Sequence, residues 1–316
     1  MVSELCIVGG GAVGSVLAYY AYRSGFTNIP VYYASRETVE LVTSAGGVVV
    51  EDRVRGETTL VPIVPRLSET PLDRCRFVFN AVKAYSVRES LDLVKKILEP
   101  GGVVVMLQNG FGSLELAEEV IVEGKVAGGV VYFGAERVSR NRVVYHGGNT
   151  VIAGCRKIPC PELSRLAQAL KAGGLDFRVV DNIDYYRWLK LALNAVVNSI
   201  TAITRSRNKI LLESEAVELA NLILGEVVEA ARLSGYDLDK DRLLEHVVKS
   251  ARLVQDNVPS TLQDVMRGSQ TEIDYLNGYV VKILGEKAPV NKTITLLVKL
   301  IEKARARGYE VQPTAL

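Results

Sequence analysis

LCIVGGGAVGSVLAYYAYRSG, residues 5–25, joins an apolar strand pattern to a helical pattern through a glycine-rich turn. Within that turn, Gly9, Gly11 and Gly14 fit the spacing G-x-G-x-x-G. The first glycine permits a tight turn, the second lets the backbone approach a pyrophosphate, and the third lets helix and strand pack closely. A purely structural glycine turn is the alternative. We expect a dinucleotide-binding loop formed by Gly9, Gly10, Gly11, Ala12, Val13 and Gly14.

The rest of the first half alternates short Val- and Ile-rich runs with helical patterns. Alternating strands and helices, with strands that are apolar throughout, are typical of a parallel sheet covered on both faces. Strands are expected at 5–10, 29–34, 77–82, 101–107 and 126–133, and helices at 13–24, 35–45, 86–98 and 113–123. An antiparallel hairpin is expected at 47–64, turning near Arg55-Gly56, and another antiparallel pair is expected to run through 142–154.

After about residue 181, strand patterns cease and amphipathic helical segments continue to residue 309. A chain of 316 residues is long enough for about two domains. The sequence therefore predicts an α/β protein with a Rossmann-type dinucleotide-binding domain at 1–181 and an all-helical domain at 182–316.

Composition narrows the class of partners. The formal net charge is +2 and the basic residues are scattered, so neither nucleic acid nor an anionic membrane surface is expected as a partner. The first residues lack the pattern of a signal peptide, and no apolar run of about 18 residues suggests a membrane span. We therefore expect a cytoplasmic protein, and the apolar helices of the second half also allow a homodimer.

The chain has four cysteines, Cys6, Cys75, Cys155 and Cys160, and two histidines. No Cys-x-x-Cys pair occurs, so a metal site is not expected. Without a secretion signal we expect all four cysteines to be reduced. The sequence leaves open whether Cys155 and Cys160 pair.

The second expected strand ends in Tyr33-Ala34-Ser35-Arg36. NAD-binding proteins usually end this strand with an acidic residue that binds the ribose hydroxyls. Here Arg36 precedes the nearest acid, Glu37, and a guanidinium can bind a 2′-phosphate through charge-assisted hydrogen bonds. This favours NADP(H) without excluding NAD(H); a solvated arginine in the first turn of a helix is the alternative.

KLALNAVVNSITAIT, residues 190–204, is apolar except for one face. Lys190, Asn194 and Asn198 follow one another at intervals of four and so form a polar stripe on a helix. Such groups are costly to bury without partners. Either neighbouring residues satisfy the polar stripe, or it lines a cleft that receives a polar ligand.

Five segments occur in the same order as in a known enzyme family: the glycine loop, VKAYS (82–86), LQNGFG (107–112), KLALNAVVNSITAI (190–203) and STLQDVMRGSQTEIDYLNG (260–278). Together they resemble the ketopantoate reductase, or 2-dehydropantoate 2-reductase, family over essentially the whole chain. The resemblance implies NADPH-dependent reduction of 2-dehydropantoate to (R)-pantoate, for pantothenate and coenzyme A synthesis. It also implies an active site in the cleft between a dinucleotide-binding domain and a helical domain.

The resemblance assigns roles residue by residue. Lys190 would be the general acid and Glu272 its carboxylate partner, which also contacts the substrate hydroxyl. Asn109 would contact both cofactor and substrate. The other implied substrate contacts are Asn194, Asn198, Asn208 and Ser260, and the other implied cofactor contacts are Arg36, Lys83 and Ala135.

For two of these residues, Glu272 and Ser260, the local sequence also indicates a structural role. Glu272 shares a helical face with Leu276, Tyr279 and Ile283 if the segment is a continuous helix. Ser260 after Pro259 is typical of an N-cap.

The rival functions are a related NAD(P)-dependent reductase of another 2-oxo acid or an imine, and a non-catalytic dinucleotide sensor.

Overall fold

The computed structural model describes residues 2–309. The chain divides into two compact units, Met1–Gln108 with Gly112–Tyr186, and Asn109–Phe111 with Arg187–Leu316. Among the described residues, no helix is long and apolar enough to cross a membrane.

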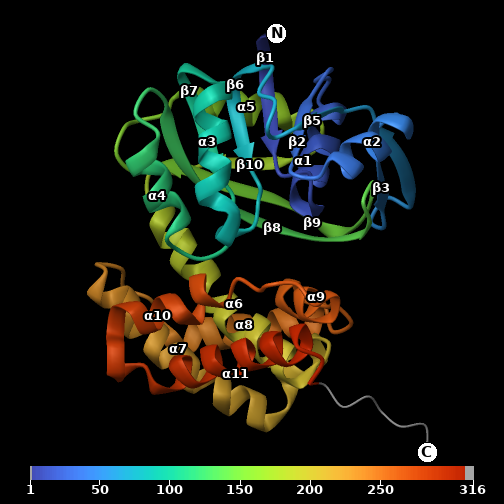
Figure 1. Ribbon diagram of the computed structural model, residues 1–316. Coiled ribbons are helices and arrows are strands. Elements are labelled where there is room, and N and C mark those ends of the chain that lie inside the picture. The colour runs from blue at the N-terminus through green and yellow to red at the C-terminus, as the bar shows by residue number, and fades with distance from the viewer. Residues whose placement is uncertain (1, 310–316) are drawn as a thin grey trace, which may run out of the picture. The chain divides into compact units, whose positions relative to one another are not determined.

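The strands of the first unit form one ten-stranded sheet in the order β4-β3-β9-β8-β7-β6-β1-β2-β5, with β10 pairing with β9 (Figure 1). Neighbouring strands are parallel except for the pairs β3–β4 and β8–β9. The strands are β1 (Val2–Val8), β2 (Pro30–Tyr33), β3 (Val48–Asp52), β4 (Glu57–Val61), β5 (Val64–Leu67), β6 (Arg74–Asn80), β7 (Leu98–Met106), β8 (Lys125–Ser139), β9 (Arg142–Cys155) and β10 (Asp176–Val179).

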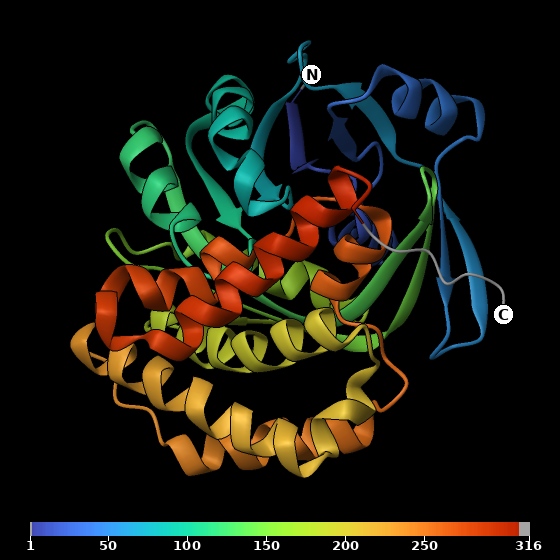
Figure 2. The same ribbon diagram turned by 60° about the horizontal axis from the view of Figure 1, so that its bottom comes forward.

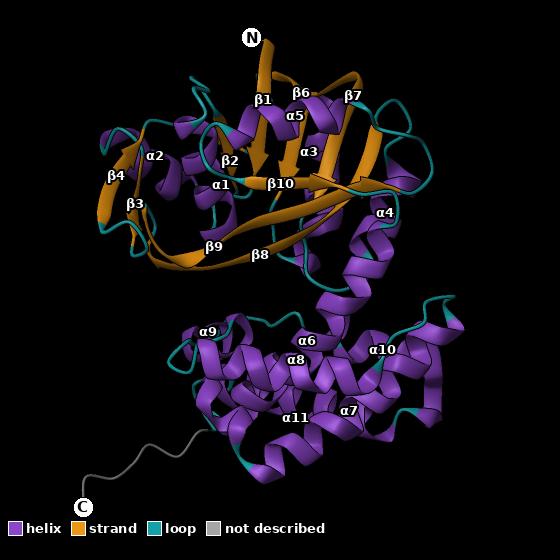
Figure 3. Ribbon diagram, turned by 180° about the vertical axis from the view of Figure 1, so that it is seen from behind, coloured by secondary structure: helices purple, strands orange, loops and turns teal. Residues whose placement is uncertain are grey.

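Helices cover both faces of this sheet, as expected from its apolar strands. The helices of the first unit are α1 (Ala12–Arg23), α2 (Arg36–Ser44), η1 (Ala84–Ser86), α3 (Val87–Ile97), α4 (Ser113–Val120) and α5 (Glu162–Lys171). One apolar layer contains buried residues of α1 and α5, and the other contains those of α3 and α4. Accordingly, α3 lies in front of the sheet in Figure 1, whereas α5 lies in front in the reverse view of Figure 3.

The expected hairpin at 47–64 is confirmed, since β3 and β4 pair antiparallel around a turn at residues 53–56. Asp52 fixes this turn because its carboxylate accepts hydrogen bonds from the backbone amides of Val54 and Arg55. Tyr19 of α1 donates to the same carboxylate at 3.0 Å and thereby joins the hairpin to the helix layer.

The antiparallel pair expected through 142–154 is present, but only one of its strands lies in this segment. These residues form the single strand β9, which pairs antiparallel with β8. Gly147 and Gly148 both have positive φ, 120° and 79°, which resembles a turn in the sequence. In the structure they lie where the pairing of β9 with β8 shifts register, opposite Tyr132 and Gly134.

The expectation of four reduced cysteines is also wrong, because the structure has two disulfides. Cys6 of β1 pairs with Cys75 of β6, with their Cα atoms 5.9 Å apart. Cys155 pairs with Cys160 across a Cα distance of 6.0 Å. Both distances lie in the range that a disulfide spans. The expectation rested on the compartment, whereas the fold brings the side chains together.

Within residues 187–309 the described structure is helical, as Figure 3 shows by colour. The helices pack side by side in Figure 2 around a core that includes Trp188, Ile223, Val280 and Val298. The helices are α6 (Ile183–Thr204), η2 (Asn208–Leu212), α7 (Ser214–Leu233), α8 (Lys240–Leu253), α9 (Ser260–Arg267), η3 (Ile273–Tyr275), α10 (Asn277–Leu284), η4 (Gly285–Lys287) and α11 (Pro289–Ala306).

Candidate active site

The glycine loop connects β1 to α1, and each glycine of the motif meets a different constraint. Gly9 has a φ of +98°, and a Cβ there would lie 2.7 Å from the Val82 amide nitrogen. A Cβ on Gly14 would overlap the Gly9 carbonyl oxygen. A Cβ on Gly11 would meet nothing within 4 Å. The first and third glycines therefore permit close packing, and the second leaves the loop open to approach from outside.

The start of α1 offers donors for an anion. Gly11 occupies the N-cap and provides no side-chain acceptor to the first amides of the helix. These amides, with the positive end of the helix dipole, favour a phosphate group. The open face of Gly11 and the uncapped amides of Ala12 and Val13 thus fit the pyrophosphate of a dinucleotide.

Arg36 is the first residue of α2, three residues beyond the end of β2. Its side chain is exposed and forms no ion pair with any residue in 2–309. The neighbouring acid, Glu37, is engaged by Arg140 at 2.8 Å. Because Arg140 compensates that carboxylate, the exposed Arg36 guanidinium keeps a positive charge that suits a phosphate.

Lys83 and Ala135 lie in the same unit as the glycine loop. Lys83 directly follows Val82, whose backbone abuts Gly9, and precedes the 3-10 turn η1. Ala135 lies on β8 and packs against the same apolar layer as Ala12. The structure therefore brings both residues near the elements that carry the loop.

Gln108 is a residue of this edge that sequence reasoning missed. Its side-chain amide donates to the carbonyl oxygens of Asn80, at 2.9 Å, and Val82, at 3.1 Å. It thereby ties the residue after β7 to the end of β6. Its place in LQNG, directly after an apolar strand, was the only signal in the sequence.

In the second unit, the polar stripe of α6 meets two of the other predicted residues. Asn194 and Asn198 are buried, with 7% and 4% of their surface exposed. Asn194 donates to the Asn109 side-chain oxygen at 3.2 Å, and the Ser260 hydroxyl donates to Asn198 at 3.5 Å. The polar stripe is therefore the centre of a cluster drawn from three segments far apart in the sequence.

Lys190 begins the polar stripe and is half-buried. Burial disfavours its charged form and lowers the pKa of the ammonium from 10.5 to about 8. A lysine with this pKa is still mostly protonated at neutral pH but gives up its proton far more readily than an exposed one. Such a group is suited to general acid catalysis.

Glu272 is buried, with 6% of its surface exposed, but it does not lie on a long helix. It precedes the short turn η3, and Leu276, with φ −107° and ψ −103°, separates η3 from α10. The helical face that we expected to run from Glu272 to Ile283 is therefore wrong. Asn277 donates to the Ala195 carbonyl oxygen of α6, a tertiary contact that accompanies the break.

Asn208 and Ser260 differ in their relation to the polar stripe. Ser260 is the first helical residue of α9, and Pro259 holds the N-cap, so the expected N-cap role is wrong. Asn208 binds the segment before α9 instead, donating from its side chain to Val254 and from its backbone to Asn257, both at 3.1 Å. These contacts give Asn208 a supporting position.

The loop that carries Asn109 is held by residues that the sequence did not indicate. Gly110 has positive φ, and a Cβ there would overlap the Tyr275 carbonyl oxygen. Phe111 donates its backbone amide to that same oxygen at 3.1 Å. Arg187 lies over the Phe111 ring, 4.1 Å from its centroid. Close packing on both sides thus fixes the backbone beside Asn109.

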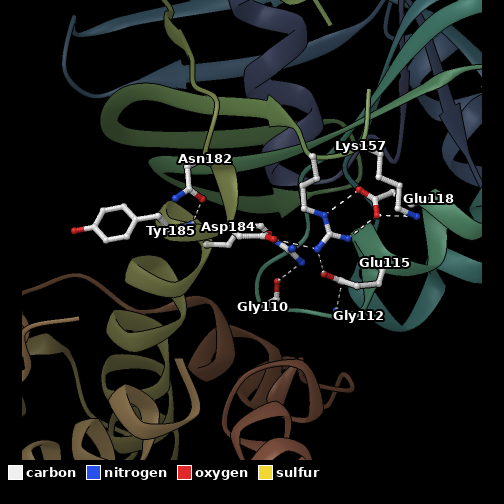
Figure 4. A network of polar contacts seen from close by, with 10 residues as sticks. Gly110, Gly112, Glu115, Glu118, Lys157, Asn182, Asp184 and Tyr185 are labelled. Carbon is white, nitrogen blue, oxygen red and sulfur yellow. Dashed lines mark hydrogen bonds and ion pairs between the residues drawn. The ribbon is translucent and has the colours of Figure 1, made fainter. Parts of the chain in front are cut away.

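In the first unit, Arg156 joins α4 to the first turn of α6. Figure 4 labels its partners Glu115, Glu118 and Asp184. Its guanidinium contacts Glu118 at 2.6 Å, Asp184 at 3.0 Å and Glu115 at 3.1 Å. Burial alone would lower the pKa of Arg156, but hydrogen bonds to Glu118 and Asp184 raise it above its ordinary value. Glu115 also accepts the Gly112 amide, so the network reaches the loop after Phe111.

Comparison with known proteins identifies the family. Sequence models described as "Ketopantoate reductase PanE/ApbA" and "Ketopantoate reductase PanE/ApbA C terminal" match residues 5–157 and 182–302. A 2-dehydropantoate 2-reductase of Pyrobaculum aerophilum is 33% identical, covering 94% of this chain and 98% of its own. The chain belongs to the ketopantoate reductase family.

Solved structures share the fold over nearly the whole chain. A ketopantoate reductase from Ralstonia eutropha JMP134 matches with a TM-score of 0.86 and 25% identity, covering 96% of this chain and 99% of its own. A D-mandelate dehydrogenase, solved with NADH and anilino(oxo)acetate, matches with a TM-score of 0.88, 22% identity and the same coverage. At that identity the second likeness concerns the fold alone.

Proposed function

We propose that this enzyme reduces 2-dehydropantoate to (R)-pantoate with NADPH, in pantothenate and coenzyme A synthesis. Membership of the ketopantoate reductase family supports the reaction. The observation that carries it is the polar stripe, where a lysine with a pKa of about 8 shares a buried helix face with two amides. These amides contact Asn109 and Ser260.

In this proposal, the cofactor supplies a hydride to the substrate's carbonyl carbon. The amides of Gly11, Ala12 and Val13 bind the pyrophosphate, with the neighbouring Gly9, Gly10 and Gly14 shaping the loop. The Arg36 guanidinium binds the 2′-phosphate. The remaining cofactor contacts that we propose are Lys83, Asn109 and Ala135.

Lys190 donates a proton to the carbonyl oxygen as negative charge develops there. Its ammonium also stabilises that charge before the proton moves. Asn194, Asn198 and Ser260 offer hydrogen bonds to the substrate's hydroxyl and carboxylate. Glu272 holds the ammonium or the substrate hydroxyl, and Asn208, whose side-chain amide donates to Val254, is a further proposed substrate contact.

The direct test is loss of NADPH absorbance when 2-dehydropantoate is added to the purified protein. The proposal expects turnover with this substrate in preference to other small 2-oxo acids. Turnover with another 2-oxo acid or an imine, and none with 2-dehydropantoate, would select a related reductase. NADPH binding without turnover of any of these compounds would indicate a dinucleotide sensor.

The preference for NADP(H) rests on Arg36. Arg36→Ala should weaken NADPH binding roughly 10-fold to 100-fold, because a charge-assisted hydrogen bond is lost, and should leave NADH binding nearly unchanged. Arg53→Ala, at an exposed arginine in the β3–β4 turn, is the matched control. Equal losses for both cofactors in the Arg36 variant would contradict the assignment.

We also propose that the enzyme is cytoplasmic and forms a homodimer. Helix α11 exposes Leu296, Leu297 and Leu300, which lie on neighbouring positions of one face. Light scattering coupled to size-exclusion chromatography should give twice the monomer mass. A monomer at all concentrations would reject the dimer.

A further inference from the structure

The hydroxyl of Tyr33 is buried at the end of β2 and meets no hydrogen-bond partner among residues 2–309. Only 5% of the Tyr33 surface is exposed. Its ring lies directly against the glycine loop, since a Cβ on Gly10 would overlap the phenol carbons and approach the hydroxyl oxygen. This close contact is the reason for glycine at position 10.

An unpaired buried hydroxyl disfavours folding, because water no longer solvates it. Phenylalanine would fill the same space without that cost. The adjacent Tyr32 shows the ordinary solution, since its hydroxyl donates to the Asp73 carboxylate at 2.8 Å in the opposite apolar layer. The Tyr33 hydroxyl is therefore an unused donor placed at the glycine loop.

The end of the second strand is where NAD-binding proteins carry the carboxylate that binds the ribose hydroxyls. A phenol in this place differs from a carboxylate in two ways: it is neutral and it can donate. Burial raises the pKa of the Tyr33 hydroxyl well above its ordinary value, so it keeps its proton. A neutral hydroxyl can donate a hydrogen bond to a neighbouring phosphate, whereas a carboxylate would repel that phosphate.

The charges around Tyr33 have the matching sign. The charge of Arg137 on β8 acts on the Tyr33 hydroxyl. Arg140, in the turn after β8, donates to the Ser35 hydroxyl at 3.2 Å, just before Arg36. Arg36, Arg137 and Arg140 thus bring three positive charges from α2 and from β8 with its following turn, against the one carboxylate of Glu37, which pairs with Arg140.

We propose that the Tyr33 hydroxyl donates a hydrogen bond to the 2′-phosphate of NADPH and so helps to select this cofactor over NADH. The inference rests on the proposed use of NADP(H) and deepens it: Arg36 supplies charge from the first turn of α2, and Tyr33 supplies a neutral donor from the strand below the loop.

The test is Tyr33→Phe, which removes the hydroxyl and keeps the ring. NADPH and NADH affinities are measured by isothermal titration calorimetry without substrate. The NADPH dissociation constant should rise about 10-fold or more, as expected for loss of a hydrogen bond to a charged group, with NADH affinity within about twofold of the parent. Tyr32→Phe is the matched control and should leave both affinities unchanged.

Thermal unfolding of the ligand-free protein gives an independent readout. Tyr33→Phe should leave the midpoint unchanged or raise it, because an unpaired buried hydroxyl is removed. Tyr32→Phe should lower the midpoint, because the hydrogen bond to Asp73 is lost. A midpoint that falls as far in Tyr33→Phe as in Tyr32→Phe would show that the hydroxyl has a structural partner and would overturn the inference.

Two binding results would also overturn it: NADPH affinity of Tyr33→Phe within about twofold of the parent, or equal losses for NADPH and NADH. Arg36→Ala, measured beside Tyr33→Phe, distinguishes a failure of the role of Tyr33 from a failure of the proposed preference for NADP(H). Lost NADPH selectivity in Arg36→Ala with unchanged selectivity in Tyr33→Phe removes the role of Tyr33 alone. A parent protein that binds NADH as tightly as NADPH removes the proposed cofactor preference as well.

Discussion

Lys190 lies on a helix whose other inward positions are apolar, so its ammonium is retained at a cost in hydration. If it is the general acid, Lys190→Ala should lower kcat by ~10²–10⁴-fold. NADPH affinity should hold, since the glycine loop belongs to the other unit. Steady-state kinetics and calorimetry measure the two quantities.

Lys209→Ala, at an exposed lysine of η2, controls for the loss of a positive charge. Circular dichroism should show both variants folded. A folded Lys190→Ala enzyme that reduces 2-dehydropantoate within about threefold of the parent would exclude the lysine acid. The polar stripe would then be a structural feature satisfied by its neighbours.

The same residue sets a pH dependence. Only the protonated amine can donate, so kcat/KM for reduction should be level below pH 8 and fall as the pH rises through about 8, the pKa of Lys190. Lys190→Arg should lose this limb, because a guanidinium keeps its proton throughout. A parent profile that stays flat to pH 10 would contradict the assignment.

The lowered pKa of Lys190 should also make the free energy of unfolding depend on pH. The folded-state pKa is lowered from 10.5, so the unfolded chain binds more protons between about pH 8 and 10.5. The contribution of Lys190 to the free energy of unfolding should therefore increase with pH across this window. Chemical denaturation of the parent and Lys190→Ala at several pH values measures the difference.

At the level of single residues, periodicity found what lies on one helix and missed what depends on distant partners. The polar stripe follows from intervals of four, and its contact with Asn109 agrees with the expected juxtaposition. The supporting roles of Gln108 and Gly110 depend on the backbone of residues 82 and 275, which no local pattern reveals. The lack of a partner for Tyr33 is likewise a property of the folded chain.

At the level of elements, apolar runs and glycine spacing predicted most strands and helices of the first unit. The errors share a cause, since each concerns a segment where a tertiary contact overrides the local signal. Gly147 and Gly148 resemble a turn but lie in one long strand. The segment after Glu272 resembles one helix but breaks at Leu276.

Helix α11 depends on a cap from another helix. Ala288 at its N-cap offers no side-chain acceptor. Glu226 of α7 accepts hydrogen bonds from the backbone amides of Val290 and Asn291, both at 2.8 Å, and from the Asn291 side chain at 2.6 Å. Glu226→Ala should lower the free energy of unfolding by about 2 kcal/mol, the upper range for loss of a cap.

Glu229→Ala is the matched control one turn further along α7. Its carboxylate forms an ion pair with Arg232 on the surface, so the unfolding midpoint should hardly change. Urea denaturation of both variants provides the comparison. Equal midpoints for the two variants would show that Glu226 does not stabilise α11.

At the level of the whole molecule, the two units have separate apolar cores, and both disulfides lie in the first. Length and composition predicted two domains but not this asymmetry, because cysteine pairing depends on which strands become neighbours. Cys6 and Cys75 are 69 positions apart in sequence, yet β1 and β6 pair side by side.

The two disulfides should differ in their effect on stability, because the entropy of loop closure grows with loop length. The chain-entropy relation gives about 4 kcal/mol for the Cys6–Cys75 loop and about 2 kcal/mol for the Cys155–Cys160 loop. Guanidinium denaturation of the parent with and without a reductant measures their sum. The same measurement on Cys155→Ala/Cys160→Ala isolates the Cys6–Cys75 bond and leaves the two fully buried sulfurs, those of Cys6 and Cys75, in place.

In that double variant, the reductant should still cause more than half of the loss seen in the parent. Intact mass spectrometry before and after reduction supplies the covalent evidence, since each disulfide lowers the mass by two hydrogens. A protein isolated with thiols blocked at lysis that shows no mass difference would restore the four reduced cysteines expected from the sequence. A mass difference of four hydrogens would establish both bonds in the isolated protein. The Cys6–Cys75 bond joins β6 to β1, the strand that leads into the glycine loop. Because reduction destabilises the unit that carries this loop, a reductant should also weaken NADPH binding near the unfolding transition.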